Sequence, residues 1–302
     1  MHLTLKQLKV FEAVAEYRSY TEAAKKMHMT QPAVSMQVKQ LELQAGLTLF
    51  DRLGKKVSIT HAGEELLHYS KNIHQQLEEA EQVLEELKGL KRGKLHLTMA
   101  STANYFAPIL LAAFHHKYPD VKMTLDVTNR AGLISAVENN TTDMVIMGRP
   151  PRDNNLVGIP FMDNPLVAIA APSHPLAKKK KITLAELQGE TFIVREKSSG
   201  TRIAVDRFFS EHRLELPAGM EMNRSEAIKQ AVMAELGLGI VSLHTLDMEL
   251  SLKRLVVLNV EDFPIMRQWH IVHRKGKRFA AIPDAFKNFV LDQAKELIKL
   301  PG

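Results

Sequence analysis

Apolar residues recur at helical spacing in the first part of the chain. Leu5, Leu8, Phe11 and Val14 fall on one side of a helix and predict one buried stripe. A second helix is predicted over residues 21–27, where small alanines allow two helices to cross closely. The pattern therefore predicts two tightly coupled helices close to the start of the sequence.

A third helix follows after a tight connection at residues 28–29. Thr30 is a good N-cap, and Pro32 fits the first turn, where no intrahelical N–H is required. Val34, Val38 and Leu41 share one side and are expected to face the core. The opposite side is small, polar and basic, with Met36 as its apolar member.

A helix that presents its N-terminal end after a short turn suits insertion into the major groove of DNA. There Gln31 and Ser35 could hydrogen-bond base edges while Lys39 reaches a phosphate. The predicted DNA contacts on this helix are Thr30, Gln31, Pro32, Ser35, Met36 and Lys39. The alternative is a three-helix packing module with a solvated third face.

The stretch "LFDRLGKKVSIT" predicts a strand, a basic Gly-containing turn and a second strand, because Val57 and Ile59 alternate with polar residues. Its basic side chains, Arg52, Lys55 and Lys56, would let the hairpin lie along the DNA backbone or minor groove as a wing. A merely solvated basic turn is the alternative.

A long helix is predicted from His61 to Lys88, with Thr60 as its cap. Its apolar residues follow a heptad pattern interrupted only by Ser70, and acidic residues flank the seam. The heptad residues are Leu66, Ile73, Leu77, Ala80, Leu84 and Leu87. We expect a short coiled coil that dimerises the protein, followed by a hinge at residues 89–94; the alternative is a surface helix packed on its own domain.

The rest of the chain alternates strands and helices, which favours an open α/β sheet. After residue 164 the alternation repeats, so we expect two α/β lobes with a cleft between them, as in solute-binding proteins. The predicted first-lobe segments are residues 94–101, 104–120, 121–128, 130–140 and 143–148; the second-lobe segments are 191–196, 200–212, 225–239 and 240–243. A strand at 267–274 and a helix at 283–298 should return to the first lobe.

Composition narrows the function classes. The formal charge is only +6, but residues 1–60 hold nine Lys and Arg against five Asp and Glu, whereas residues 61–88 hold seven Glu against two Lys. A basic head before an acidic helix indicates an anionic partner met by the head alone. The sequence contains no Cys, no signal peptide, no apolar run long enough for a membrane span and no catalytic or metal-binding motif. We therefore expect a cytoplasmic protein that is not an enzyme, has no metal or cofactor and does not bind a membrane.

Two helices should begin at the cleft, one after Ser101 and Thr102 and one at Ser198–Arg202. Helix N-termini and hydroxyl groups donate hydrogen bonds to anions, and Arg149 and Arg202 are candidate clamps for a carboxylate or phosphate. An anionic metabolite is the working hypothesis for the ligand. The alternative is that these Ser and Thr residues only cap their helices.

The runs "LKVFEAVAEYRSYTEAAKKMHMTQPAVSMQVKQLELQAGLTLFDR" and "KKVSITHAG" resemble the winged helix-turn-helix of LysR-type transcriptional regulators. Met36 departs from the pattern, since many members carry Arg there. The resemblance implies a periplasmic-binding-protein-like, two-lobed α/β effector domain preceded by a winged helix-turn-helix and a long linker helix. It also implies a homodimer through the linker helix and, as is common in the family, a homotetramer. It carries effector contacts onto Ser101, Thr128, Arg149, Ser198, Ser199, Gly200 and Thr201; Thr102, Asn129 and Arg202 are added from their neighbourhood.

The expected domains are residues 1–60 for DNA binding, 61–90 for the linker, and 91–302 for the effector domain. Its lobes are residues 91–164 with 267–302, and residues 165–266. The stretches "TQPAVSMQVKQLE", "SSGTR", "MNRSEAIKQAV" and "RQWHIVHRKGKRFAAIPDAF" are similar to the CbbR subgroup, which regulates Calvin-cycle (Rubisco) operons. That similarity implies a sugar bisphosphate, phosphoglycolate or NADPH as effector, and we expect an activator that binds double-stranded promoter DNA. A LysR-type regulator of amino-acid, sulfur or nitrogen metabolism, or a solute-binding protein, stays open as an alternative.

Overall fold

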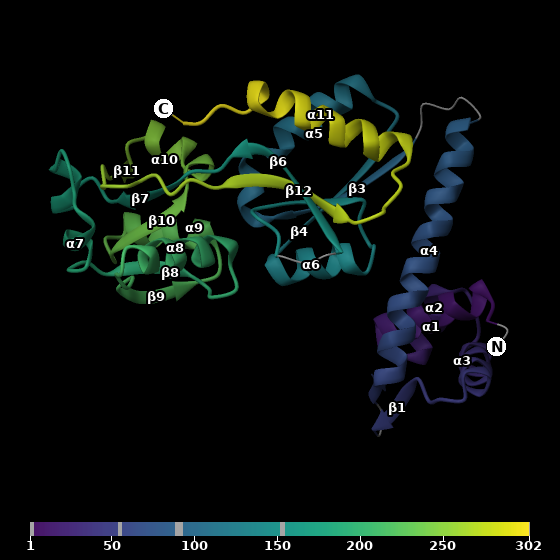
Figure 1. The fold of residues 1–302 in the computed structure, drawn as a ribbon. Coiled ribbons are helices and arrows are strands. Elements are labelled where there is room, and N and C mark those ends of the chain that lie inside the picture. Colours follow the sequence, from purple (N-terminus) through teal and green to yellow (C-terminus); the bar gives the residue numbers. More distant parts are fainter. Residues whose placement is uncertain (1–2, 54–55, 88–92, 152–154, 302) are drawn as a thin grey trace. The chain divides into compact units, whose positions relative to one another are not determined.

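The fold was analysed in a computed structural model, which describes residues 3–53, 56–87, 93–151 and 155–301 (Figure 1). The chain divides into two compact units. The first is formed by Met1–Leu84 with Asn139–Thr141, and the second by Glu85–Glu138 and Thr142–Gly302.

The first unit is a three-helix head followed by a hairpin and a long helix (Figure 1). Thr4 caps the first helix in a reciprocal capping box with Gln7, and Ser19 and Thr30 cap the next two. The elements are α1 (Leu5–Tyr17), α2 (Tyr20–Lys26), α3 (Gln31–Ala45), β1 (Phe50–Leu53), β2 (Lys56–Ile59) and α4 (His61–Leu87). Residues of α1, α2, α3 and β1 share one buried core. The predicted winged helix-turn-helix is confirmed.

Helix α4 begins where the sequence predicts. The hydroxyl of Thr60 accepts a hydrogen bond from the Gly63 N–H at 3.1 Å. Gly63 permits a close approach, since a Cβ there would lie 2.3 Å from the Leu49 carbonyl oxygen. Ser70, the polar interruption of the heptad pattern, is fully buried and donates to the Glu12 carboxylate of α1. Ser70 therefore anchors the helix to the head.

The first lobe of the second unit has a five-stranded mixed sheet in the order β4-β3-β5-β12-β6. Its strands are β3 (Lys94–Ala100), β4 (Lys122–Thr128), β5 (Met144–Met147), β6 (Leu156–Asp163) and β12 (Gln268–Arg274). Its helical segments are the 3₁₀ turn η1 (Ser101–Tyr105), α5 (Ala107–Lys117), α6 (Arg130–Glu138) and α11 (Ala281–Leu297). Phe106, Phe114, Trp269 and Phe286 are buried in its core.

The second lobe has a sheet in the order β11-β7-β10-β8-β9. Its strands are β7 (Leu166–Ala170), β8 (Phe192–Arg195), β9 (Ala218–Met222), β10 (Leu238–Ser242) and β11 (Val256–Val257). Its helical segments are η2 (Pro175–Lys178), α7 (Leu184–Leu187), α8 (Gly200–Glu211), α9 (Ser225–Met233), η3 (Leu243–Thr245) and α10 (Asp247–Ser251). Parallel strands β10, β8 and β9 present the carboxyl end of β8 toward the start of α8.

The chain crosses between the lobes twice, from β6 to β7 and from Ile265 to β12. The crossings run side by side: the Asn164 N–H donates to the Arg267 carbonyl at 2.7 Å, and Leu166 and Ile265 exchange backbone hydrogen bonds. The predicted two-lobed α/β architecture is confirmed, and in the structure β12 and α11 belong to the sheet and core of the first lobe.

Two local predictions are corrected. The helix predicted from residue 104 to before Pro119 is η1 followed by α5, because Phe106, with φ −132°, interrupts the helical backbone. Strand β6 was not predicted, since Gly158 and Pro160 disfavour strand interiors; β6 tolerates them at the edge of its sheet.

Candidate functional site

Helix α3 has a buried side and an exposed side, as its pattern predicts. Val34, Val38 and Leu41 are at most 1% exposed and pack in the head core. Thr30 is the N-cap, its hydroxyl accepting from the Ala33 N–H at 3.4 Å. The helix is therefore held by its core side, and its other side is available to a partner.

The predicted DNA-contacting residues of α3 lie on this accessible side. Gln31, Pro32 and Lys39 are exposed, Ser35 is half-buried, and Met36 is 63% exposed. Thr30 is exposed at the tip of the helix. The surface thus offers hydrogen-bonding groups, one long apolar side chain and one cation along a single helix face.

The predicted wing is a two-stranded antiparallel hairpin in which Phe50 pairs with Ile59 and Leu53 with Lys56. Lys55 and the side chains of Arg52 and Lys56 lie outside the described residues. Their DNA contacts therefore stay predictions.

A small inner pocket of about 50 Å³ lies between the two lobes. The first lobe supplies hydroxyl and amide groups after β3 and β4, and the second lobe supplies the first turn of α8. Seven of the ten predicted effector-binding residues line it: Ser101, Thr102, Thr128, Asn129, Ser199, Gly200 and Thr201. Several of them also serve the fold, since Ser199 caps α8 and the Asn129 side chain accepts from the Gly132 N–H at 2.9 Å.

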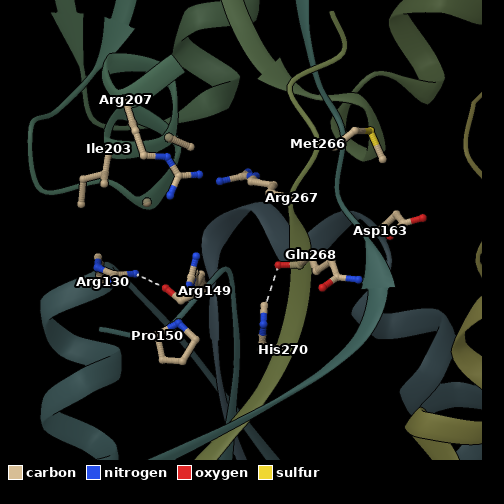
Figure 2. Close-up of a pocket in the computed structure, with 12 residues that line it drawn as sticks. Arg130, Arg149, Pro150, Asp163, Ile203, Arg207, Met266, Arg267, Gln268 and His270 are labelled. Carbon is tan, nitrogen blue, oxygen red and sulfur yellow. Dashed lines mark hydrogen bonds between the residues drawn. The ribbon is translucent and has the colours of Figure 1, made fainter. Parts of the chain in front are cut away.

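A larger cavity of about 660 Å³ adjoins the inner pocket and is within the size range of metabolite sites. Four arginines line it: Arg130 from α6, Arg149 after β5, Arg207 from α8 and Arg267 at the second crossing. Figure 2 shows these side chains reaching into the same space from both lobes. Asp163 is the acidic residue in its lining, so positive charge dominates.

Arg267 joins the inner pocket to the larger cavity, because it lines both. Its guanidinium donates to the Thr201 hydroxyl at 3.2 Å. Burial, and then repulsion from Arg195, lower the pKa of Arg267 to about 9. The lowered pKa means that the positive charge of Arg267 is poorly compensated in the folded protein. An anion bound in the cleft would stabilise the charged form.

Two neighbours have pKa values shifted the same way. Burial lowers the pKa of Arg130, whose guanidinium donates to the Arg149 carbonyl at 2.9 Å (Figure 2). Burial is also the largest cause of the lowered pKa of His270; its bond to the Gln268 carbonyl opposes that shift, and repulsion from Arg149 adds to it. The cationic groups of the cleft would therefore be stabilised by a bound anion.

Three of the predicted effector contacts lie outside the inner pocket. Arg149 lines the larger cavity. Ser198 is exposed and lines neither cavity. Arg202 lines neither cavity: its guanidinium donates to Asp206 at 2.7 Å and to the Arg195 carbonyl at 3.0 Å, and lies 3.7 Å from Glu221.

Sequence reasoning missed Arg130, Arg195, Arg207, Arg267 and His270. Sequence signals could have found three of them. Arg267 opens the strand at which the chain was expected to re-enter the first lobe, and Arg130 directly follows the predicted contact Asn129. Arg207 lies seven residues after Gly200, which is two helical turns and therefore the same face.

A winged helix-turn-helix joined to a two-lobed domain with an anion-accepting cleft defines a ligand-responsive DNA-binding regulator. The family models agree with this class: residues 5–64 match the bacterial regulatory helix-turn-helix protein of the lysR family, and residues 88–295 match the LysR substrate binding domain. The chain therefore belongs to the LysR family. Its members are transcriptional regulators, not enzymes, and bind DNA and small-molecule effectors.

Relatives of known name cover almost the whole chain. The RuBisCO operon transcriptional regulator of Allochromatium vinosum is 54% identical over 98% of this chain and 98% of its own length. The HTH-type transcriptional activator CmpR of Synechocystis sp. is 40% identical over 98% of each chain. The solved CcmR regulatory domain of Synechocystis, in complex with 2-PG (2-phosphoglycolate), is 39% identical, covers 67% of this chain and 98% of its own, and has a TM-score of 0.64.

No helix in the described part of the chain is both long and apolar enough to cross a lipid bilayer.

Proposed function

We propose that this LysR-family protein regulates a carbon-fixation (Rubisco) operon in response to a small phosphorylated metabolite bound between its lobes. The observation that carries the proposal is the cleft in which four arginines surround one cavity with a single acidic residue in its lining. A phosphorylated compound supplies the missing negative charge, and arginine binds phosphate through paired hydrogen bonds. The 54% identity to a RuBisCO operon regulator supports the choice of operon.

The 2-PG complex of the CcmR regulatory domain supports a phosphate together with a carboxylate as the ligand chemistry. In our proposal one anionic group occupies the inner pocket, where Ser101, Thr102 and Thr201 offer hydroxyls and Arg267 offers its guanidinium. The other faces Arg149 in the larger cavity. A sugar bisphosphate or NADPH also presents separated phosphates and belongs in the same test.

The activity that the effector controls is binding of promoter DNA by the head. Gln31 and Ser35 read base edges, Lys39 and the basic wing neutralise phosphates, and α4 pairs two chains into a dimer, with a homotetramer as the full assembly. Exposed apolar side chains along α4, namely Ile73, Leu77 and Leu84, support the dimer because a second helix would cover them. Effector binding between the lobes would alter how the dimers engage their half-sites, and hence the bend of the DNA and activation of transcription.

The test is a calorimetric titration of the full-length protein with 2-phosphoglycolate, ribulose bisphosphate, NADPH, acetylserine and a dicarboxylate. Arg149→Gln should weaken binding of the phosphorylated ligand about 10- to 100-fold, because it removes a charged hydrogen-bonding partner. The matched control is Arg254→Gln, which changes an exposed arginine of the second lobe that lines neither cavity. Binding of acetylserine or the dicarboxylate alone would move the protein to the amino-acid, sulfur or nitrogen branch and refute the carbon-fixation assignment.

A separate test addresses DNA recognition. Gln31→Ala should relax sequence preference, whereas Lys55→Ala should weaken binding to all sequences alike. Binding to a panel of single-base operator variants measures both. Equal loss of discrimination in the two variants would contradict the proposed division of roles.

A further inference from the structure

A buried ammonium group lies in the second lobe, outside the effector cleft. Lys229 of α9 is 2% exposed, and its Nζ lies 2.6 Å from a Glu249 oxygen, 2.8 Å from Glu226 Oε2 and 2.9 Å from the Thr245 carbonyl. A buried charge is tolerated only when it is paired and hydrogen-bonded. Lys229 therefore ties α9 to α10 and η3 within one lobe.

The first lobe joins this cluster through Tyr105, the last residue of η1. Its hydroxyl donates to Glu226 Oε2 at 2.9 Å, and its ring centroid lies 4.7 Å from the Lys229 Nζ, within range of a cation–π interaction. The next residue, Phe106, packs against His244 with ring centroids 5.4 Å apart and ring planes tilted by 51°. These contacts cross from one lobe to the other.

The two elements that make the contact between the lobes, η1 and α9, both begin close to the inner pocket. On the first lobe, η1 starts with Ser101 and Thr102, which line that pocket, and ends with Tyr105. On the second lobe, α9 starts with Ser225, whose hydroxyl accepts from Arg195 at 3.3 Å, and Arg195 lines the pocket. One short element on each side therefore links the ligand-facing groups to the contact.

We propose that Tyr105 and Glu226 form an interlobe latch that holds the cleft in its effector-binding arrangement. The proposal rests on the proposed function of the cleft as an anion-binding site. Tyr105 and Glu226 line neither cavity, so they act as positioning residues: they keep Ser101 and Thr102 of one lobe opposite Arg195 and Thr201 of the other. Pre-forming the site lowers the cost of ordering it when the effector binds.

The hydroxyl of Tyr105 can be removed without removing the ring. Tyr105→Phe keeps the aromatic face over Lys229 and deletes only the hydrogen bond to Glu226. We expect affinity for 2-phosphoglycolate to fall roughly three- to tenfold, the range for one hydrogen bond in protein stability. The matched control is Tyr118→Phe, which deletes a hydroxyl from a half-buried ring of the first lobe packed on Phe114.

A double-mutant cycle separates the latch from a general structural effect. In the Glu226→Ala background, where Lys229 keeps its Glu249 partner, Tyr105→Phe should cause no further loss of affinity. Additive losses in the double variant would overturn the proposal, since the two residues would then act independently.

The position of the lobes is measured without any effector. Because the sequence has no Cys, a labelled pair can be introduced at the exposed residues Asp120 and Lys180, one in each lobe, as Asp120→Cys and Lys180→Cys. Dipolar electron spin resonance should give a broader interlobe distance distribution for Tyr105→Phe than for the wild type or Tyr118→Phe. The latch is refuted if the three distributions coincide.

The two readouts keep this proposal distinct from the proposed function. If the wild type fails to bind every phosphorylated compound while Tyr105→Phe still broadens the distance distribution, the effector assignment fails and the latch itself stands as a contact between lobes. If the wild type binds 2-phosphoglycolate and Tyr105→Phe changes neither affinity nor distance, the latch fails and the effector assignment stands.

Discussion

Helix α3 and the effector cleft both carry cations suited to a phosphate, but the cations differ in their exposure to solvent. On α3, the cation Lys39 is exposed to solvent beside Gln31 and Met36. In the cleft, Arg267 is half-buried and repelled by Arg195, so its charge is costly before any ligand arrives. An exposed cation costs the folded protein little, whereas a partly buried and poorly compensated cation is stabilised when an anion binds beside it.

This difference predicts how the affinity of each surface should depend on salt and on single residues. The head meets a polyanion through separate exposed contacts, so its affinity should depend on salt and little on any one residue. The cleft meets one small ligand through converging charges, so each arginine should matter a great deal and salt should matter less. The following predictions test this contrast, beginning with the largest expected effect.

Salt should separate the two surfaces most strongly. With Lys39, Arg52, Lys55 and Lys56 on phosphates, a dimer would neutralise about eight, which gives a slope of about −7 in log affinity against log salt. Raising salt from about 50 to 200 mM would then lower operator affinity roughly 10⁴-fold. Fluorescence anisotropy with labelled operator measures the slope, and 2-phosphoglycolate affinity titrated in the same buffers should change far less. Equal slopes would contradict the contrast.

Removing the Arg267 charge should affect function and stability in opposite directions. Arg267→Gln should weaken 2-phosphoglycolate binding about 100-fold, since it deletes a buried charge from the ligand site. In the absence of effector the same change relieves burial and repulsion from Arg195, so the unfolding midpoint should rise by roughly 2–4 °C. Calorimetry and thermal denaturation measure the two effects. A lower midpoint together with weaker binding would show that Arg267 serves the fold.

The same contrast explains what could be predicted from the sequence. The head was predictable because its signals are local: the stripe of α1, the Thr30 cap and the alternating hairpin lie within a few residues of one another. The cleft was predictable only in part. Ser199 and Gly200 lie where a helix start was expected, but Arg130, Arg207 and Arg267 meet through tertiary folding, which periodicity does not encode.

Helix α8 shows why the candidate clamp Arg202 lines neither cavity whereas Arg207 lines the larger one. It carries both Arg202 and Arg207, and the sequence favoured Arg202 because it stands in the first turn. Helical phase turns Arg202 toward Asp206 and Glu221, whereas Arg207, two turns after Gly200, lines the cavity. The choice between them depends on which side of α8 packs on the second lobe, and that is known only from the fold.

Effector affinity should depend on pH on both sides of neutrality. Below about pH 6 a phosphate monoester gains a proton and binds more weakly. At the alkaline end, anion binding raises the pKa of Arg267 above its value of about 9 in the free protein, so the complex holds more protons than the free protein there. Affinity should therefore fall as the pH rises through about 9. Titrations from pH 5 to 10 measure the profile, and Arg267→Gln should lose its alkaline limb.

The smallest expected effect concerns the apolar member of the α3 face. Met36 is 63% exposed, and an exposed apolar side chain in the major groove can contact the C5-methyl group of thymine. Replacing single thymines of the operator by deoxyuridine removes one methyl group at a time. At one position in each half-site the wild type should lose about two- to fivefold in affinity, the value of one buried methyl group. Met36→Ala should be insensitive to that substitution and should bind thymine and deoxyuridine operators alike. If the variant stays as sensitive as the wild type, Met36 does not read that base, and the sequence preference of α3 rests on its polar residues.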